Sequence, residues 1–285
     1  YQARLHEQPC YRITTTNGLA SGNSLEEAVC HALCELIERD SMTLAELASN
    51  YLTQVLQDGG RGGPLADAAA VDRLRGLHPH LRLETAPPAV QELLGRFHAA
   101  GIEVRAVDIT SDLGIPSFFA ATREDIGFAV SQGHGGYGTH PDAEVALLRA
   151  LSECAQGRAV DIQAMREDIS LPGQKVPKYE LHVRRSASVD EHGWAWEPAG
   201  RTVGMTEIPT RPGDDVRADI DLTLDRLRAA GLPRVIVVDL SPPRIPVSVV
   251  RVMVPGLESW ATDYCRIGAR GAAAWQAAVR TLSPV

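Results

Sequence analysis

The stretch NGLASGNSLEEAVCHALCELIERD, residues 17–40, decides the fold because it leads from a turn of small residues into an amphipathic helix. Ser24 is a favourable helix N-cap and Glu27 follows three positions later, so the pair predicts a capping box. The helical pattern covers residues 24–50. The turn would offer free backbone N–H groups and the positive end of the helix dipole, which suits a phosphate group.

This helix carries its charged and apolar side chains on opposite sides. At about 100° per residue, they form an acidic stripe of Glu27, His31, Glu35 and Glu38 and an apolar stripe of Val29, Leu33, Leu36 and Ile37. The acidic stripe lacks the Lys partners four residues away that stabilise a solvated helix. A divalent cation would relieve the repulsion between its carboxylates, and Mg²⁺ prefers oxygen ligands. A solvated acidic face is the alternative interpretation.

A second helical segment repeats part of this pattern. AEVALLRALSECAQ, residues 143–156, aligns without gaps to residues 25–38 with five identities. It follows the glycine-rich stretch SQGHGGYGTH, residues 131–140, and its own polar stripe consists of Arg149, Glu153 and Gln156. We therefore hypothesise a duplicated ligand cradle, in which the first helix holds metal ions and Arg149 neutralises phosphate charge.

Composition limits the class of protein. The chain has 285 residues, of which 44% are hydrophobic and 22% charged, as in an ordinary globular protein. Its formal net charge of −8 argues against nucleic-acid binding. No apolar run approaches the roughly 18 residues of a membrane span, and no signal peptide opens the chain. We therefore expect neither a nucleic-acid nor a membrane partner.

The five cysteines argue against a disulfide framework, because their number is odd and no CxxC pair occurs. Cytoplasmic localisation fits this pattern best. Cys30 and Cys34 lie four residues apart on the first helix and are expected to be buried thiols. Cys10 and Cys265 could relay sulfur, but nothing in the sequence indicates an acidic thiol, so we do not assign them this role.

Strand and helix patterns alternate without a strict βαβ rhythm, which predicts a mixed α/β (α+β) fold. The expected strands are 104–110, 118–122, 127–131, 235–240 and 247–254. The further expected helices are 66–75, 89–100, 142–165 and 217–230. The expected loops are 58–64, 171–177 and 209–215, and 178–200 is irregular.

Several other residues could be over-interpreted. His134 and His140 flank the glycine-rich stretch without a third ligand at metal spacing, so polar loop positions are expected. Trp194 and Trp196 could contact peptide or fill a core, and both alternatives stay open. Surface ion pairs are the default for two further arginines, Arg251 and Arg270.

The string TNGLASGN…EEAVCHALCELIERD resembles the YcaO family, ATP-dependent enzymes that activate backbone amides in peptides. Further matches follow in the family's order: TSDLGIP (110–116), HPDAEVALLRALSECAQGR (140–158), MREDI (165–169) and VVDL…IPVSVVRVMVPGLE (237–258). Together they span most of the chain. The amino-acid sequence around GLASGN, TSDLGIP and PGLE most resembles that of YcaO proteins that work with a TfuA partner.

The resemblance implies a YcaO-like fold with mixed sheets and a site for ATP and Mg²⁺ between acidic helices. By this resemblance the ATP-binding residues are Ala20, Asn23, Glu27, Arg39, Arg149, Glu153 and Gln156. The Mg²⁺ ligands are Glu27, Glu35 and Glu38. The catalytic residues are not assigned.

Two departures from the family pattern qualify this expectation. An earlier acidic helix of the form Ser-x3-Glu-x2-Glu-Arg is not found ahead of residue 17. We therefore expect residues 1–285 to form a single YcaO domain that lacks the family's N-terminal segment. The chain also ends in RTLSPV rather than in the Pro-x-Pro-x-Pro tail typical of azoline-forming members, which weakens a cyclodehydratase assignment.

In the family's chemistry a nucleophile adds to the amide carbon, and the amide oxygen takes the γ-phosphate of ATP before it leaves as phosphate. Thioamide formation from sulfide, with a TfuA-like partner, is our first expectation. Azoline formation by a side chain, or amidine formation by an amine, is the alternative. The expected substrate is a precursor peptide or protein, an E1-like or peptide-recognition partner could replace TfuA, and a homodimer stays open. A catalytically idle scaffold is the alternative of another class, against which the intact carboxylate set argues.

Overall fold

The computed structural model describes residues 15–58, 68–125, 131–164, 193–197, 200–259 and 267–282. Several expectations lie outside these ranges: the loops 58–64 (beyond its first residue) and 171–177, the segment 165–169, most of 178–200, Cys10 and Cys265, and the strand 127–131 apart from its last residue.

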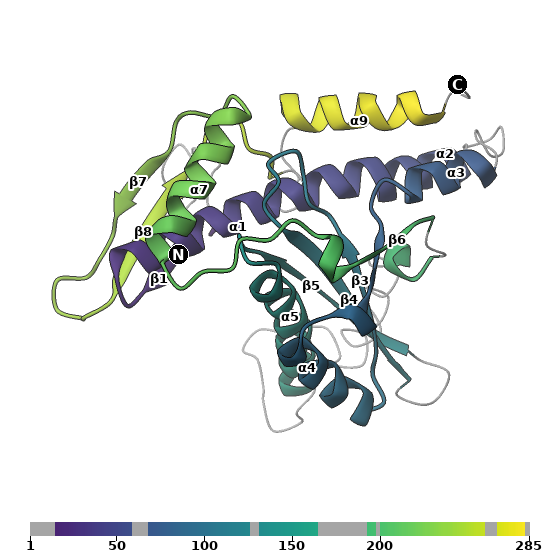
Figure 1. The fold of residues 1–285 in the computed structure, drawn as a ribbon, viewed down its shortest axis with the longest axis horizontal. Helices are drawn as coiled ribbons and strands as arrows, with labels where there is room; N and C mark the ends of the chain where they lie inside the picture. The colour runs from purple at the N-terminus through teal and green to yellow at the C-terminus, as the bar shows by residue number, and fades with distance from the viewer. Residues whose placement is uncertain are drawn as a thin grey trace, which may run out of the picture.

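The larger of two sheets has five strands in the order β5-β4-β3-β2-β6 (Figure 1). The strands are β2 (His80–Arg82), β3 (Glu103–Asp108), β4 (Ser117–Asp125), β5 (Ser131–Thr139) and β6 (Thr202–Gly204). All neighbouring pairs are antiparallel except β2 and β6. Short 3₁₀ helices η4 (Leu83–Thr85) and η7 (Met205–Glu207) follow β2 and β6.

Alternating residues of this sheet fill two separate cores. Phe118 and Ala120 pack with α4 (Pro88–Ala99) and α5 (Ala143–Ala164) on one face. Phe119 and Ala121 pack on the opposite face, against the end of α1 (Leu25–Ala45) and the short helix η6 (Gly193–Trp196). Because the side-chain period of a strand is two, one strand sequence serves both cores.

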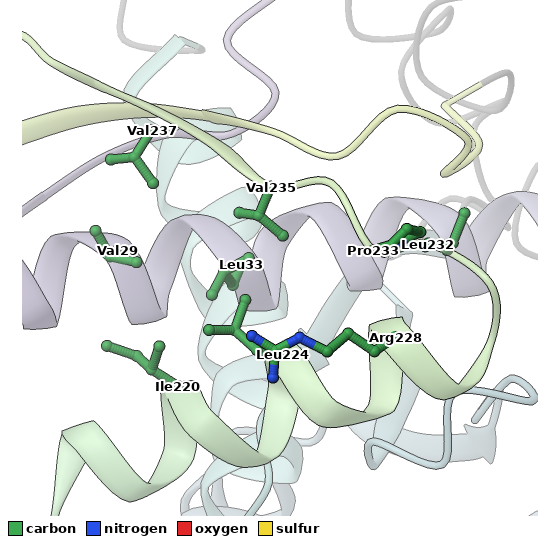
Figure 2. Close-up of a pocket in the computed structure, with 9 residues that line it drawn as sticks. All are labelled: Val29, Leu33, Ile220, Leu224, Arg228, Leu232, Pro233, Val235 and Val237. Atoms are coloured by element: carbon green, nitrogen blue, oxygen red, sulfur yellow. The ribbon is translucent and has the colours of Figure 1, made fainter.

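The smaller sheet has the order β1-β8-β7 and is antiparallel throughout. Its strands are β1 (Leu19–Gly22), β7 (Ile236–Asp239) and β8 (Ser248–Met253). α1 and α7 (Val216–Ala229) pack against it, and buried Val250 and Val252 of β8 meet the apolar stripe of α1. Figure 2 shows the apolar groove beside this contact, a cavity of about 270 Å³ lined by residues of α1, α7, the segment that leads into β7, and β7 itself.

The helix α1 is shared by both sheets, and the chain continues from it without a break. A π-helix, η2 (Glu46–Tyr51), joins it to α2 (Leu52–Asp58). The long helix crosses the molecule in Figure 1, with α3 (Ala68–Arg75) and α9 (Ala269–Leu282) alongside its later part. Ala48 and Leu52 pack there with Leu74 and Ala278.

A buried ion pair attaches α9 to α1. Arg270 donates to the carboxylate of Asp40 from Nε at 3.0 Å and from Nη2 at 2.8 Å, and Asp40 is fully buried. The Glu258 carboxylate accepts from the backbone N–H groups of Gly268 and Gly271 at the start of α9, each at 2.8 Å. Arg270 therefore has a structural role: besides this buried pair it forms the expected surface pair, with exposed Asp112.

The structure confirms the mixed α/β class and corrects three local predictions. The small residues 19–22 form β1 rather than a turn, and 131–139 form β5 rather than a loop. The final helix, α9, was not predicted, although its apolar and polar residues separate at the helical period. Within the described ranges, no helix is long and apolar enough to cross a membrane.

Candidate functional site

The first turn of α1 is fixed by hydrogen bonds within residues 23–27. Ser24 is the N-cap, and its Oγ accepts from the backbone N–H of Glu27 at 3.2 Å. The Glu27 carboxylate reaches one residue further back than a capping box requires. It accepts from the backbone N–H of Asn23 at 2.8 Å and from Asn23 Nδ2 at 3.0 Å. Glu27 and Asn23 thus hold each other at the point where β1 enters α1.

The polar stripes of α1 and α5 face each other across a cavity of about 310 Å³. The α1 side consists of His31, Glu35, Glu38 and Arg39, and the α5 side of Arg149, Ser152, Glu153 and Gln156; Tyr137 of β5 also lines the cavity. The two helical stripes, which the sequence hypothesis joins in one ligand cradle, are therefore opposite walls of one cavity.

Two glycines of β5 allow α5 to approach closely enough to form this wall. A Cβ added at Gly138 would lie 2.6 Å from the backbone nitrogen of Ala150, and one added at Gly136 would lie 2.8 Å from that of Cys154. Both separations are shorter than real Cβ contacts. The glycine-rich stretch is thus a strand whose missing side chains make room for a helix backbone.

Glu38 is buried more deeply than Glu35, with the two side chains 12% and 21% exposed. Burial raises its pKa to about 7, helped by the negative charges of Glu153 and Glu35 and opposed by Arg39 and Arg149. Arg39 Nη2 lies 3.8 Å from Glu38 Oε1, too far for a hydrogen bond. Among the described residues no donor hydrogen-bonds this carboxylate. A bound cation would therefore supply the close positive charge that these residues do not.

Backbone groups fix the other site carboxylates and Arg149. Glu35 Oε2 accepts from the backbone N–H of Gly18 at 3.0 Å, and Glu153 Oε2 accepts from that of Tyr137. Arg149 Nη1 donates to the carbonyl oxygen of Thr139 at 3.3 Å. These bonds use only part of each group's capacity, so each can still bind a ligand.

A second cavity of about 330 Å³ adjoins the first and shares His31 and Arg149 with it. It is lined additionally by Ser21, Gly22, Asn23, Glu27, Cys30, His140, Val216 and Asp219. We call the two cavities together the trough. Glu27 lines the second cavity, whereas Glu35 and Glu38 line the first, so the three acidic residues predicted as one metal site occupy different parts of the trough.

The trough suits Mg²⁺ and a phosphate chain. Glu35, Glu38 and Glu153 offer the carboxylate oxygens that Mg²⁺ prefers. Arg39 and Arg149 supply guanidinium groups for phosphate oxygens. Ala20, in contrast, is buried in the core of the smaller sheet and does not line the trough, so only its backbone could contribute.

Three residues of the second cavity were not predicted as site residues. Cys30 is buried as expected but lines the second cavity, and His140 and Asp219 join it there from other elements. His134 lies buried within β5 rather than in a loop, whereas His140 lies in the connection between β5 and α5, as expected. Cys30, on the predicted helix next to the acidic stripe, and His140, beside the glycine-rich stretch, carried a signal in the sequence, whereas Asp219 carried none.

The remaining candidates have structural roles. Trp194 stacks on Phe119 with ring centroids 5.1 Å apart, and its Nε1 donates to Glu46 Oε1 at 3.2 Å. The Trp196 ring lies beneath the guanidinium of Arg123, 4.4 Å from its centroid. Arg251 donates from Nη1 to the carbonyl oxygen of Thr15 at 2.7 Å. These contacts favour packing over peptide or phosphate binding at all three residues.

A family model matches residues 1–258 and describes YcaO cyclodehydratases that bind ATP and Mg²⁺. An uncharacterized protein of Methanothermobacter thermautotrophicus is 36% identical over 258 residues, which are 90% of this chain and 59% of that protein. An uncharacterized protein in the tfuA 3′ region of Rhizobium leguminosarum bv. trifolii is 34% identical over 266 residues, 90% of this chain and 56% of that one. The chain thus spans less than two thirds of the length of these relatives.

Solved structures give the same relationship. YcaO from Methanopyrus kandleri, bound with AMPPCP and Mg²⁺, superposes with a TM-score of 0.59 at 26% identity, over 89% of this chain and 58% of that one. A heterocyclase in complex with substrate and cofactor also gives 0.59 at 26% identity, over 86% of this chain and 28% of that one.

Proposed function

The chain belongs to the YcaO family, and on that premise we propose that it uses ATP and Mg²⁺ to activate a backbone amide of a ribosomally made peptide or protein. One observation carries the proposal: the stripe around buried Glu38 faces the stripe around Arg149 across a single cavity. The AMPPCP and Mg²⁺ bound by the Methanopyrus kandleri relative support the same choice of ligands.

The proposed roles follow from charge and position. Bound ATP supplies the phosphoryl group that makes the amide oxygen a leaving group. Glu35 and Glu38 hold Mg²⁺, with Glu153 opposite them as a further oxygen ligand. Arg149 and Arg39 neutralise phosphate charge. Further polar contacts to the nucleotide come from Asn23 and Glu27 at one end of the trough and from Gln156 at the other. Ala20 precedes Ser21 in β1, so only its backbone is available for this role.

The product we propose is a thioamide, formed with sulfide and a TfuA-like partner. The Rhizobium relative supports this choice because it is described as lying in a tfuA 3′ region. The second candidate is azoline formation, supported by the heterocyclase structures, among them TruD at a TM-score of 0.57 and 26% identity.

Mass spectrometry of a candidate peptide distinguishes these products. The chain is incubated with the peptide, ATP, Mg²⁺, sulfide and the TfuA-like partner. A gain equal to replacing one oxygen by sulfur indicates a thioamide, loss of one water indicates an azoline, and replacement of oxygen by NH, with an amine supplied, indicates an amidine.

The test variant is Glu38→Gln, which should give no product. The matched control is Glu26→Gln, which changes an exposed carboxylate of the same helix outside the trough and should still give product. Unchanged peptide and no ATP turnover with the unmodified chain and any peptide would overturn the proposal in favour of a binding scaffold.

A further inference from the structure

Three reactive side chains from separate elements converge in the second cavity. Cys30 comes from α1, His140 follows β5, and Asp219 comes from α7. The sulfur, one ring nitrogen and one carboxylate oxygen lie within 4.8 Å of one another. Cys30 is 7% exposed and Asp219 8%, so the cluster is enclosed but opens onto the trough.

The hydrogen bonding of His140 limits what this cluster can do. The backbone N–H of Asp142 donates to His140 Nδ1 at 3.0 Å. The proton of the neutral ring therefore lies on Nε2, which is 3.7 Å from Asp219 Oδ2. A metal ligand normally coordinates through one ring nitrogen and donates from the other, and here the second nitrogen accepts instead. The arrangement favours an Nε2–H donor over a metal ligand.

The same surroundings favour the thiolate form of Cys30. A hydrogen bond from the Cys34 thiol lowers the pKa of Cys30 most, and His140 and Arg149 lower it further, against the opposing effect of burial. The pKa of Cys34 is raised, first by this same bond, so Cys34 keeps the proton that it donates. Cys154 provides a contrast. Burial raises its pKa, and its thiol donates a hydrogen bond to the carbonyl oxygen of Ala120, with Sγ and the oxygen 3.4 Å apart.

We propose that Cys30 is a nucleophilic thiolate, held by His140 and Cys34 beside the phosphate-binding Arg149, that takes up a sulfane sulfur from a persulfide donor. The proposal rests on the proposed thioamide function, which requires a sulfur source at the trough. The Cys30 thiolate attacks the terminal sulfur of the donor. A new S–S bond forms, the S–S bond of the donor breaks, and the donor leaves as a thiolate, so this transfer needs no external oxidant or reductant. Release of the sulfur at the sulfide level consumes a second thiol, which attacks Cys30 Sγ, expels hydrosulfide and remains as a disulfide with Cys30.

The test uses glutathione persulfide on the reduced, desalted chain, without ATP, peptide or partner protein. Intact mass spectrometry should show a gain of one sulfur atom, and peptide mapping should place it on Cys30. Cys30→Ala should lose this modification, and the matched control Cys154→Ser should keep it. Because the assay needs neither nucleotide nor peptide, failure of the proposed function would leave its result unchanged.

The role of His140 is tested by the rate of iodoacetamide alkylation at Cys30 at pH 6. An ordinary thiol with a pKa of about 8.5 is only roughly 0.3% thiolate at that pH. We expect His140→Leu to slow alkylation more than about tenfold, and His140→Gln to restore much of the rate because its amide can donate from the position of Nε2. Thermal denaturation of each variant verifies that it is folded.

Three results would overturn the proposal. The first is no sulfur on Cys30 in the unmodified chain. The second is alkylation of Cys30 at the rate of an ordinary thiol, whether or not His140 is present. The third is stoichiometric copurified zinc that is lost in Cys30→Ala, which would replace the thiolate by a metal site.

Discussion

Glu38 combines two properties that rarely occur together in one carboxylate of a folded chain. It is largely buried, and among the described residues its nearest cation, Arg39, stays beyond hydrogen-bonding distance. Burial of a carboxylate without a hydrogen-bond donor costs free energy, and a purely structural residue would bring no compensating interaction. The natural explanation is a bound cation, whose charge would return Glu38 to its ionised form at neutral pH.

The first prediction follows from this position. Glu38→Gln keeps the size of the side chain but removes the charge, so ATP turnover should fall by about 100-fold or more with an unchanged far-UV circular dichroism spectrum. Glu26→Gln on the exposed side of α1 should keep normal turnover. Normal ATP turnover in both Glu35→Gln and Glu38→Gln would refute the metal assignment.

The second prediction concerns acid stability. Burial lowers the pKa of His78, which contacts Ser49, from its usual 6.5 to about 4. Below pH 6.5 the His78 ring therefore binds a proton in the unfolded chain, whereas in the folded chain it binds one only near pH 4. The stabilisation is complete above pH 6.5 and is lost as the pH falls, by about 2 kcal/mol after allowance for the partial exposure of the ring.

Urea unfolding at pH 7.5 and pH 4.5 measures this loss. His78→Gln should show a smaller drop than the unmodified chain, because carboxylates that titrate in this range contribute equally to both proteins. Equal drops in the two proteins would show that His78 is protonated in the folded state.

At the scale of elements, the contact between β5 and α5 sets the width of the trough. Gly138→Ala should push α5 away from the strand. This should lower the free energy of unfolding by about 1–3 kcal/mol, and Arg149 and Glu153 should bind ligands more weakly. Gly95→Ala on the exposed side of α4, where nothing lies within 4 Å, should instead gain about 0.5–1 kcal/mol. Urea midpoints compare the two, and similar shifts in both would contradict the close-approach explanation.

The sequence predicts elements well where one face of one element carries the signal. α1 and α5 were predictable as long helical segments, and the acidic stripe of α1 and the polar stripe of α5 followed from the helical period. β1 and β5 were not, because glycine and serine indicate turns when the partner that needs close approach is unknown. β2 and β6 are only three residues long and carry too little pattern.

The site was predictable only in part, for a related reason. The wheel of α1 groups Glu27 with Glu35 and Glu38, but it cannot show that Glu27 turns back to Asn23 at the helix start. Cys30, His140 and Asp219 belong to three elements, so their meeting depends on the packing of α1, β5 and α7 rather than on any local spacing.

At the scale of the whole molecule, α1 joins two otherwise separate cores. Its N-terminal half belongs to the core of the smaller sheet, and its C-terminal end belongs to one face of the larger sheet. A ligand held between α1 and α5 would therefore stabilise both parts of the molecule at once.

The corresponding prediction is that Mg²⁺ and ATP together raise the melting temperature by several degrees. At a ligand concentration of 100 times Kd, binding to the folded state alone adds about 2.7 kcal/mol. EDTA should remove the shift, and Glu38→Gln should not show it. An equal shift with ATP and EDTA would indicate nucleotide binding without a metal.

The π-helix between α1 and α2 determines how α2 is rotated about the helix axis relative to α1. Its wider turn takes up one residue more than an α-helix would, so α2 is rotated by about 100° relative to an unbroken helix. In that rotated frame Leu52 meets Leu74 and Ala278. The length of this segment therefore matters more than its composition: deletion of Asn50 should turn Leu52 to solvent and lower the melting temperature far more than Asn50→Ala does.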